Sequence, residues 1–270
     1  MKKRVSTFVF LIVLMASLAC AQPNDAPTDH SKYDPIGVTN VTLIGFLALG
    51  LFALIAMCAG EGLSEFQKKA LFILLTLIVV GVTVYFVGST LYKNFSSVTK
   101  GPIHWHLDYE IYNCGQQVDL IDPTGMSNKV GSSVFHEHND NRIHIEGVVI
   151  KHSDINLKNY FAIVGGMLEK GLLKIPTNNG EVVMQDGALC NGQPATLQAF
   201  LFKTTNPKEH NNWFFVQEKL ENYPDYVMSQ NAVIPPGDCI IFEFGPEKAT
   251  TDHLCETYEV ALRQGDAHGS

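Results

Sequence analysis

The sequence predicts an α+β fold, mainly β, that follows a signal peptide and two transmembrane helices. Three observations support this fold class. Two charge-free apolar runs lie within the first 92 residues, short segments of alternating polarity fill the rest of the chain, and only one of those later segments has clear helical spacing. We therefore expect a membrane anchor followed by a predominantly β domain with one main helix.

The composition agrees with this division and excludes one class of partner. Hydrophobic residues make up 46% of the 270 residues and charged residues only 17%, because the apolar excess lies in the first third of the chain. The net charge of −8 argues against nucleic acid as a partner, since binding phosphates requires a basic surface. A Gly-rich phosphate-binding loop is also missing from the sequence.

The first 21 residues have the pattern of a secretory signal peptide. Three basic residues are followed by an apolar core, and Ala19-Cys20-Ala21 offers a cleavage site between small residues. An uncleaved first membrane helix is the alternative. Cys20 could also carry a lipid, but the residues before it do not match the pattern of a lipoprotein cysteine, so we expect cleavage without lipidation.

The two apolar runs that follow are long enough to span a membrane. They extend from Thr39 to Gly60 and from Ala70 to Tyr92, and each exceeds the roughly 20 residues that a bilayer requires. Neither has a polar face, which disfavours the alternative of two buried core helices. The loop between them contains Lys68 and Lys69, so the positive-inside rule places it in the cytoplasm.

These features divide the chain into six expected segments. They are a signal peptide or first membrane helix (1–21), an exposed linker (22–38), a transmembrane helix (39–60), a cytoplasmic loop (61–69), a transmembrane helix (70–92) and an extracytoplasmic His-rich domain (93–270). The spans contain no charged residue, so we expect residues 39–92 to anchor the protein in the lipid bilayer and to contact other membrane proteins rather than to conduct ions. Small residues would permit close helix packing at Gly45, Gly50, Gly81 and Gly88.

Four cysteines lie in the exported part, at positions 114, 190, 239 and 255. An even number in an oxidising compartment predicts two disulfides, for which three pairings are open. The short loop between Cys239 and Cys255 favours that pair, which leaves Cys114 with Cys190. There is no CxxC motif, so the sequence indicates neither a redox dithiol nor a zinc ribbon.

The exported part reads as strands separated by turn signals. "IHWHLDYEIYNCGQQVDLI" predicts a strand, a turn at Asn113-Cys114-Gly115 and a second short strand. Further strands are expected in "DNRIHIEGVVIK", "GEVVMQ", "ATLQAFLFK", "DYVMSQ" and "GDCIIFEFG". "DINLKNYFAIVGGMLEKG" has helical spacing with Asp154 or Asn156 as its cap. A short additional helix is expected in the insert "TTNPKEHNNWFFVQEKLENYP".

Half of the ten histidines fall between residues 104 and 144: His104, His106, His136, His138 and His144. Residues i and i+2 of a strand face the same side, so each His-x-His pair projects to one face, and His144 pairs with Glu146 in the same way. Glu110 shares the parity of His104 and His106. We expect the five histidines to form one cluster.

Imidazoles together with a carboxylate suit a transition metal, whereas calcium and magnesium prefer oxygen ligands. We expect copper or zinc, with iron as a further option. Three or four nitrogen ligands suffice, so at least one of the five histidines would support the others, and Glu110 and Glu146 are the expected carboxylates. The alternative is a polar strand face whose histidines bond one another and Asp108 or Asp140. Three further histidines are isolated and expected on the surface: His152, His210 and His253.

Part of the histidine region resembles the first cupin motif, a glycine, His-x-His, a glutamate and a glycine. The corresponding residues here are Gly101, His104, His106, Glu110 and Gly115. The glycine spacings are shorter than in that motif. The second cupin motif is matched by Pro236 and Gly237, but Cys239 and Ile240 stand where a metal-binding histidine belongs. This resemblance implies a metal-dependent enzyme that lacks its fourth ligand.

A broader resemblance covers roughly residues 101–245. The chain resembles a group of exported bacterial and archaeal domains of unassigned function, which share an HxH strand, an IYxxG hairpin, an HxHxxxxRIHIEG block, an L-x-x-FF helix and a PPGDxIxxxFG strand. The corresponding segments here are His104–His106, Ile111–Gly115, His136–Gly147, Leu157–Phe161 and Pro235–Gly245. This chain departs from the pattern in having three rather than four residues between His138 and Arg142, and Tyr160 in place of the first phenylalanine of the helix motif. The resemblance implies one folded unit with histidines as its signature and implies no established reaction.

The sequence offers little support for catalysis. It contains neither the GxSxG of a nucleophile elbow nor the CxxCH of haem attachment. Chemistry would have to run through the metal, with Glu110 or Glu137 as base. We therefore expect a membrane-anchored, extracytoplasmic metal-binding domain, in metal handling or as an accessory subunit of a membrane complex. A metal-dependent cupin-like enzyme and a metal-free interaction module are the alternatives.

Overall fold

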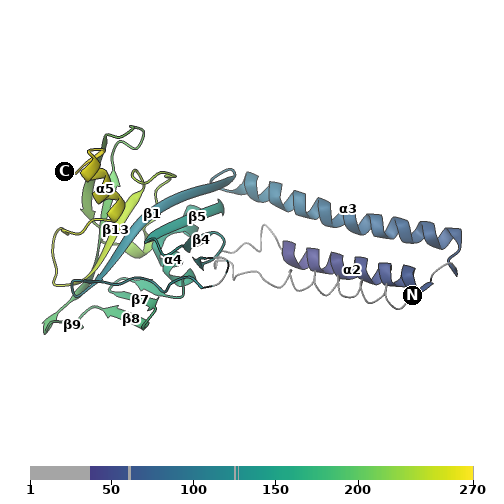
Figure 1. Cartoon of the computed structure of the whole chain (residues 1–270), viewed down its shortest axis with the longest axis horizontal. Coiled ribbons are helices and arrows are strands. Elements are labelled where there is room, and N and C mark those ends of the chain that lie inside the picture. The colour runs from purple at the N-terminus through teal and green to yellow at the C-terminus, as the bar shows by residue number, and fades with distance from the viewer. Residues whose placement is uncertain (1–36, 60–61, 125, 127, 270) are drawn as a thin grey trace. The chain divides into compact units, whose positions relative to one another are not determined.

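The computed structural model describes residues 37–59, 62–124, 126 and 128–269 (Figure 1). The described residues form two compact units, which meet in sequence between Ser96 and Ser97. The expected signal peptide (1–21) and nearly all of the expected linker (22–38) lie outside the described residues.

The first unit consists of α2 (Val38–Ala59) and α3 (Glu65–Ser96). Both helices are long and apolar enough to cross a membrane. No residue of α3 is buried by the described part of the chain. Its apolar side chains are therefore exposed, as expected for a helix that a lipid bilayer or another protein surrounds. The helix begins earlier than Ala70 because Ser64 and Gln67 form a reciprocal cap, each side chain bonding the backbone N–H of the other residue.

A glycine sets the contact between the two helices. A Cβ atom at Gly45 would lie 2.6 Å from a methyl group of Val82, so only glycine fits there. Gly81 and Gly88 have no neighbouring atom within 4 Å of such a Cβ position. The close packing expected from the glycines of the spans is therefore observed at Gly45.

The second unit is built on a mixed sheet with the strand order β14-β12-β11-β13-β1-β5-β4-β3, and β2 pairs with β1 at one end. Figure 1 labels four strands of this sheet: β13, β1, β5 and β4. β1 runs parallel to β13 and antiparallel to β5. The strands of this sheet are β1 (Pro102–Asn113), β2 (Gln116–Gln117), β3 (Val130–Gly131), β4 (Phe135–Glu137), β5 (Arg142–Val148), β11 (Thr196–Thr204), β12 (Trp213–Lys219), β13 (Asp238–Gly245) and β14 (Ala267–Gly269).

Smaller elements complete this unit. They are the sheet β6 (Met167–Glu169), β7 (Leu172–Thr177) and β8 (Gly180–Gln185), the ribbon β9 (Leu189–Cys190) and β10 (Gln193–Pro194), the helices α4 (Leu157–Ile163) and α5 (Glu256–Gln264), and the 3-10 turns η3 (His152–Ile155) and η4 (Tyr223–Asp225). The fold class is α+β with mostly β content, as predicted.

The alternation of side chains along β1 gives the sheet two different faces. Leu107, Tyr109 and Ile111 point into the larger core together with α4 and the β6-β7-β8 sheet. The residues between them point to the opposite face, where α5 packs through Tyr258 and Ala261 on a smaller core. His104 and His106 have the parity of this second face, so the histidines lie outside the larger core.

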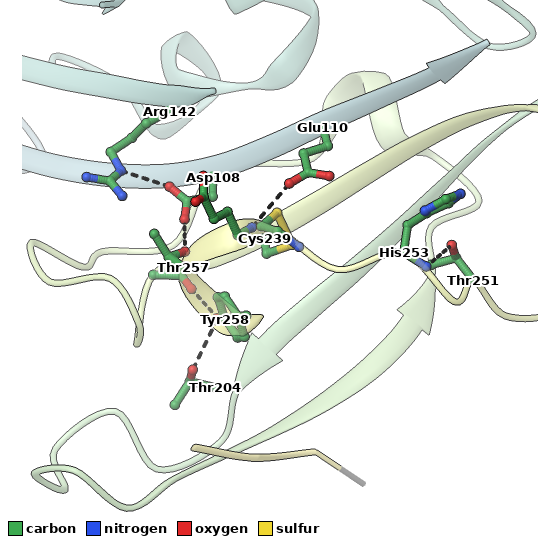
Figure 2. Close-up of a disulfide and its surroundings, with 12 residues drawn as sticks. Asp108, Glu110, Arg142, Thr204, Cys239, Thr251, His253, Thr257 and Tyr258 are labelled. Carbon is green, nitrogen blue, oxygen red and sulfur yellow. Dashed lines mark hydrogen bonds and ion pairs between the residues drawn. A yellow bond between two sulfur atoms is a disulfide. The ribbon is translucent and has the colours of Figure 1, made fainter. Parts of the chain in front are cut away.

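Two disulfides stabilise the second unit, and their pairing is the one the sequence favours. Cys114 in the turn after β1 is joined to Cys190 of β9, and Cys239 of β13 is joined to Cys255 at the start of α5. The second bridge lies beside Asp108 and Glu110 of β1 (Figure 2). It holds α5 against the sheet. Among the described residues, Cys58 is the free cysteine.

Three predictions about secondary structure are wrong. "DYVMSQ" forms no strand: η4 occupies its start, and only Val227 pairs, in an isolated bridge with Asn156. The insert before it forms the strand β12 rather than a helix, because it pairs with β11 and β14. The domain also has a second helix, α5, which ends at Gly265 in the left-handed conformation.

Candidate metal centre

Three histidines form a row across three adjacent strands. His136 of β4 is the direct partner of His144 of β5, and His144 is in turn the direct partner of His106 of β1. β5 pairs antiparallel with both β4 and β1, so side chains in one row project to the same face of the sheet. The register therefore brings the three histidines onto one patch of the sheet, although His106 and His144 are 38 positions apart in the sequence.

The two remaining histidines of the expected set join this row. The ring centroids of His104 and His106 are 4.6 Å apart, and those of His136 and His138 are 4.8 Å apart. The ring of His144 lies 4.8 Å from His106, 4.9 Å from His138 and 5.4 Å from His136. The prediction that the five histidines form one cluster is confirmed.

The cluster contains two groups of three potential ligand atoms. One group comprises His104, His106 and His144, and the other comprises His136, His138 and His144. Within each group, the atoms lie within 4.8 Å of one another. Nitrogens that share one zinc ion at about 2.0–2.1 Å are roughly 3–4 Å apart, so a modest adjustment of the side chains would complete either group.

Glu146 lies between the two groups. It is the strand partner of His104, and its Oε1 atom is 3.1 Å from Nε2 of His104 and 3.9 Å from Nε2 of His136. The Nε2 atoms of His104 and His106 are themselves 3.0 Å apart. Nε2 of His104 thus lies close to both Nε2 of His106 and Oε1 of Glu146. Each of these three atoms can provide a lone pair, so the arrangement attracts a proton or a cation.

Two of the rings are oriented by the backbone. Nδ1 of His106 lies 2.6 Å from the carbonyl oxygen of Ala232, and Nδ1 of His138 contacts the carbonyl oxygen of Asn128. A carbonyl oxygen only accepts hydrogen bonds, so both Nδ1 atoms carry the proton and donate. In the neutral ring, Nε2 is then left with a free lone pair, which is the state of a metal-ligating histidine.

Burial favours the neutral, ligand-competent form of two of these histidines. Burial lowers the pKa of His136 to about 4, although the nearby Glu146 carboxylate opposes this shift. Burial also lowers the pKa of His106, and the hydrogen bond to Ala232 only partly offsets it. Metal binding requires deprotonated imidazole, so these two rings need lose no proton to bind an ion near neutral pH.

Asp140 also lies beside the histidines, although the sequence did not indicate it as a ligand. Its Oδ2 atom lies 3.3 Å from Nε2 of His144. Burial raises the pKa of Asp140, but the hydrogen bond and the charge of His144 outweigh it and hold the pKa below its ordinary value. Asp140 lies in the turn between β4 and β5, four residues before His144. This short spacing could have indicated from the sequence that Asp140 lies near the histidine.

The structure does not bring Glu110 to the histidines, although it was expected as a carboxylate ligand. Its side chain accepts a hydrogen bond from the backbone N–H of Glu256 at the start of α5 (Figure 2). It accepts another from the hydroxyl of Tyr112. It therefore stabilises the positive end of α5. Glu110 lies on the same face of β1 as His104 and His106, as expected. It is four residues beyond His106, however, and four residues extend about 13 Å along a strand.

Asp108 lies between the cluster and Glu110 on the same face. Its carboxylate is 2.8 Å from Nε of Arg142 and also accepts a hydrogen bond from the hydroxyl of Thr257 (Figure 2). Burial raises the pKa of Asp108 despite these two partners. Asp108 thus links β5, next to His144, with α5, and its partners leave it outside the histidine cluster.

The histidines expected on the surface divide into two kinds. His152 and His210 are exposed. His253 is half-buried and stacks on Tyr112 with a distance of 3.6 Å between ring centroids, so it packs rather than protrudes. None of these three belongs to either group of potential ligands among the described residues.

The chain matches no family model, no curated protein and no solved structure.

Proposed function

We propose that this chain is a membrane-anchored protein whose extracytoplasmic domain binds a transition metal ion, copper or zinc, through the histidine cluster. Iron is a further option with this donor set. The observation that carries the proposal is the row of His136, His144 and His106 across β4, β5 and β1. Four or five imidazoles with an adjacent carboxylate are nitrogen and oxygen donors of the kind that these metals prefer.

The environment of the rings favours metal binding over the alternative of a polar strand face without a metal. His136 is 2% exposed, and its Nδ1 has no hydrogen-bond partner in the described protein, so a purely structural role leaves a buried polar atom unsatisfied. The Nδ1 atom of His144 is likewise buried and unpartnered. The rings of His106 and His138 are held by backbone carbonyls, which is how proteins orient metal-ligating histidines.

The proposed location follows from the two apolar helices and the disulfides. α2 and α3 would anchor the protein in the lipid bilayer, with the loop between them in the cytoplasm and residues 93–270 outside. Two disulfides are compatible with an oxidising compartment. The apolar surface of α3 would also suit contacts with other membrane proteins, which fits metal handling or an accessory role in a membrane complex.

The motifs shared with exported His-rich domains fall on the elements that build the site. The HxH motif lies on β1, the HxHxxxxRIHIEG block spans β4 and β5, and the PPGDxI segment leads into β13. We propose membership of that group on this basis. The cupin-like alternative is not favoured, because its motif requires Glu110 at the metal.

The test is metal affinity of the full-length, tag-free protein in detergent. Competition with a chromophoric chelator should give tight binding of Zn²⁺ or Cu²⁺ to the wild-type protein. His144→Asn removes the residue common to both groups and should weaken binding at least 100-fold. His210→Asn, at an exposed and isolated histidine, is the matched control and should bind as the wild type does. Equal affinity of the two variants would refute the proposal.

A further inference from the structure

The cluster contains more potential ligands than one ion uses. Five imidazoles lie together with the carboxylates of Glu146 and Asp140, whereas a zinc ion in a protein takes four ligands. The two groups of three overlap only at His144. A single ion held by either group of three would therefore leave two histidines of the other group without a role.

Each group has its own oriented histidine. His106 in the first group is held by the carbonyl of Ala232, in the segment before β13. His138 in the second group is held by the carbonyl of Asn128, in the segment before β3. The strand order places β1 and β4 on opposite sides of β5, so these two rings approach His144 from opposite sides.

The shared histidine lacks such an anchor. Nδ1 of His144 is buried without a hydrogen-bond partner in the described protein, and its Nε2 faces the carboxylate of Asp140. An imidazole nitrogen has one lone pair, so a histidine serves two ions only through both of its nitrogens. His106 and His138 have committed Nδ1 to the backbone, while His144 has not.

We propose that the cluster binds two metal ions, one held by His104 and His106 and the other by His136 and His138, with His144 shared between them. This inference rests on the proposed function. The ring of His144 would bridge the ions as an imidazolate, and its last N–H proton passes to solvent on binding. Oxygen Oε1 of Glu146, which lies near a histidine of each group, supplies a second link between them.

The two ions would differ in their access to solvent. The side chain of His104 is 57% exposed, whereas that of His136 is 3% exposed. The ion of the first group would therefore exchange readily, and the ion of the second group would be retained. A chelator should remove one ion quickly and the other slowly.

The experiment is a Cu²⁺ titration of the full-length, tag-free protein in detergent. Copper per chain is measured by elemental analysis after desalting, and the EPR intensity per copper is measured alongside. Two ions per chain are expected for the wild type. Bonds of about 2.0 Å on the two sides of one ring place the ions roughly 6 Å apart. Copper ions joined by such a bridge couple magnetically, so the EPR intensity per copper should fall as the second ion binds.

Variants separate the possible outcomes. His104→Ala/His106→Ala and the single variant His138→Ala should each retain one ion with full EPR intensity, and His152→Ala/His210→Ala should retain two. One ion in the wild type would overturn this inference and leave the proposed function standing. Two ions with full EPR intensity would overturn the sharing of His144. No bound ion would overturn the proposed function as well.

Discussion

His106 and His144 are direct partners across β1 and β5, and their ring centroids lie 4.8 Å apart. His144 has the same relationship with His136 on its other side, at 5.4 Å. A central strand that carries one histidine can thus present it to histidines of both neighbouring strands.

Replacing Glu146 with Gln should weaken metal binding without unfolding the domain. The change removes the carboxylate that lies between His104 and His136, and loss of such a partner costs about 10–100-fold in affinity. Its side chain is 40% exposed, so the fold should tolerate the isosteric amide. Chelator competition measures the effect, with Glu181→Gln on β8 as the control. An unchanged affinity would remove Glu146 from the site.

The metal-free domain should lose stability on acidification because of His136. Its pKa is about 4 in the folded protein against an ordinary value of 6.5. Between these values the unfolded chain binds more protons, so the contribution of His136 is fully present above pH 6.5 and is lost as the pH falls towards 4. The full effect is about 3 kcal/mol.

Urea denaturation with excess chelator, at pH 7 and pH 4.5, measures this effect. The two tryptophans of the chain, Trp105 and Trp213, both lie in the second unit, so their fluorescence reports its unfolding. His136→Gln does not titrate and should lose less stability than the wild type over this interval. Parallel pH dependence in both proteins would show that His136 is not buried as described.

The ion pair between Asp108 and Arg142 should contribute strongly to stability. Asp108 is 4% exposed, so Arg142→Met would leave a buried carboxylate without its main partner, which costs about 3–5 kcal/mol. Adding Asp108→Asn should recover part of that loss, because the buried charge is then gone. Urea denaturation of the three variants measures the coupling. Strictly additive effects would argue against the pair.

The disulfides should differ in their contributions. Chain-entropy arguments give about 4.5 kcal/mol for Cys114–Cys190 and about 3 kcal/mol for Cys239–Cys255, from sequence separations of 76 and 16. Paired Cys→Ala variants test the order by urea denaturation. Thiol labelling of the denatured, unreduced protein should modify none of these four cysteines. Labelling of all four would exclude both bridges and the oxidising location.

The topology can be tested with reporters. A reporter that is active only when exported should work when fused after Ser270, and a cytoplasm-only reporter should work in the loop between α2 and α3. The physical reason is the pair of basic residues next to that loop, Lys68 and Lys69 in the first turns of α3. Activity of the cytoplasmic reporter after Ser270 would reverse the orientation.

The sequence could predict which residues share a face but not how far apart they lie. The parity rule correctly grouped His104 with His106 and His144 with Glu146 because side chains alternate along a strand. It failed for Glu110, since parity carries no information about distance along β1. The adjacency of β4, β5 and β1 comes from tertiary pairing, which single-sequence patterns do not contain.

Other features depend on contacts that leave little trace in the sequence. α5 is short, and it is stabilised by the burial of Tyr258, by the bridge to Cys239 and by Glu110 at its N-terminus. β12 forms a strand because β11 and β14 pair with it. The carbonyls that orient the histidines belong to loops, where any residue type would supply the same group.

The measurement that tests the central claim most directly is anomalous diffraction from crystals of the zinc- or copper-loaded protein. The account predicts anomalous density in the cluster, about 2.0–2.1 Å from Nε2 of His106 or His138 and bonded to His144. Metal bound only at isolated histidines such as His210, with none in the cluster, would contradict it.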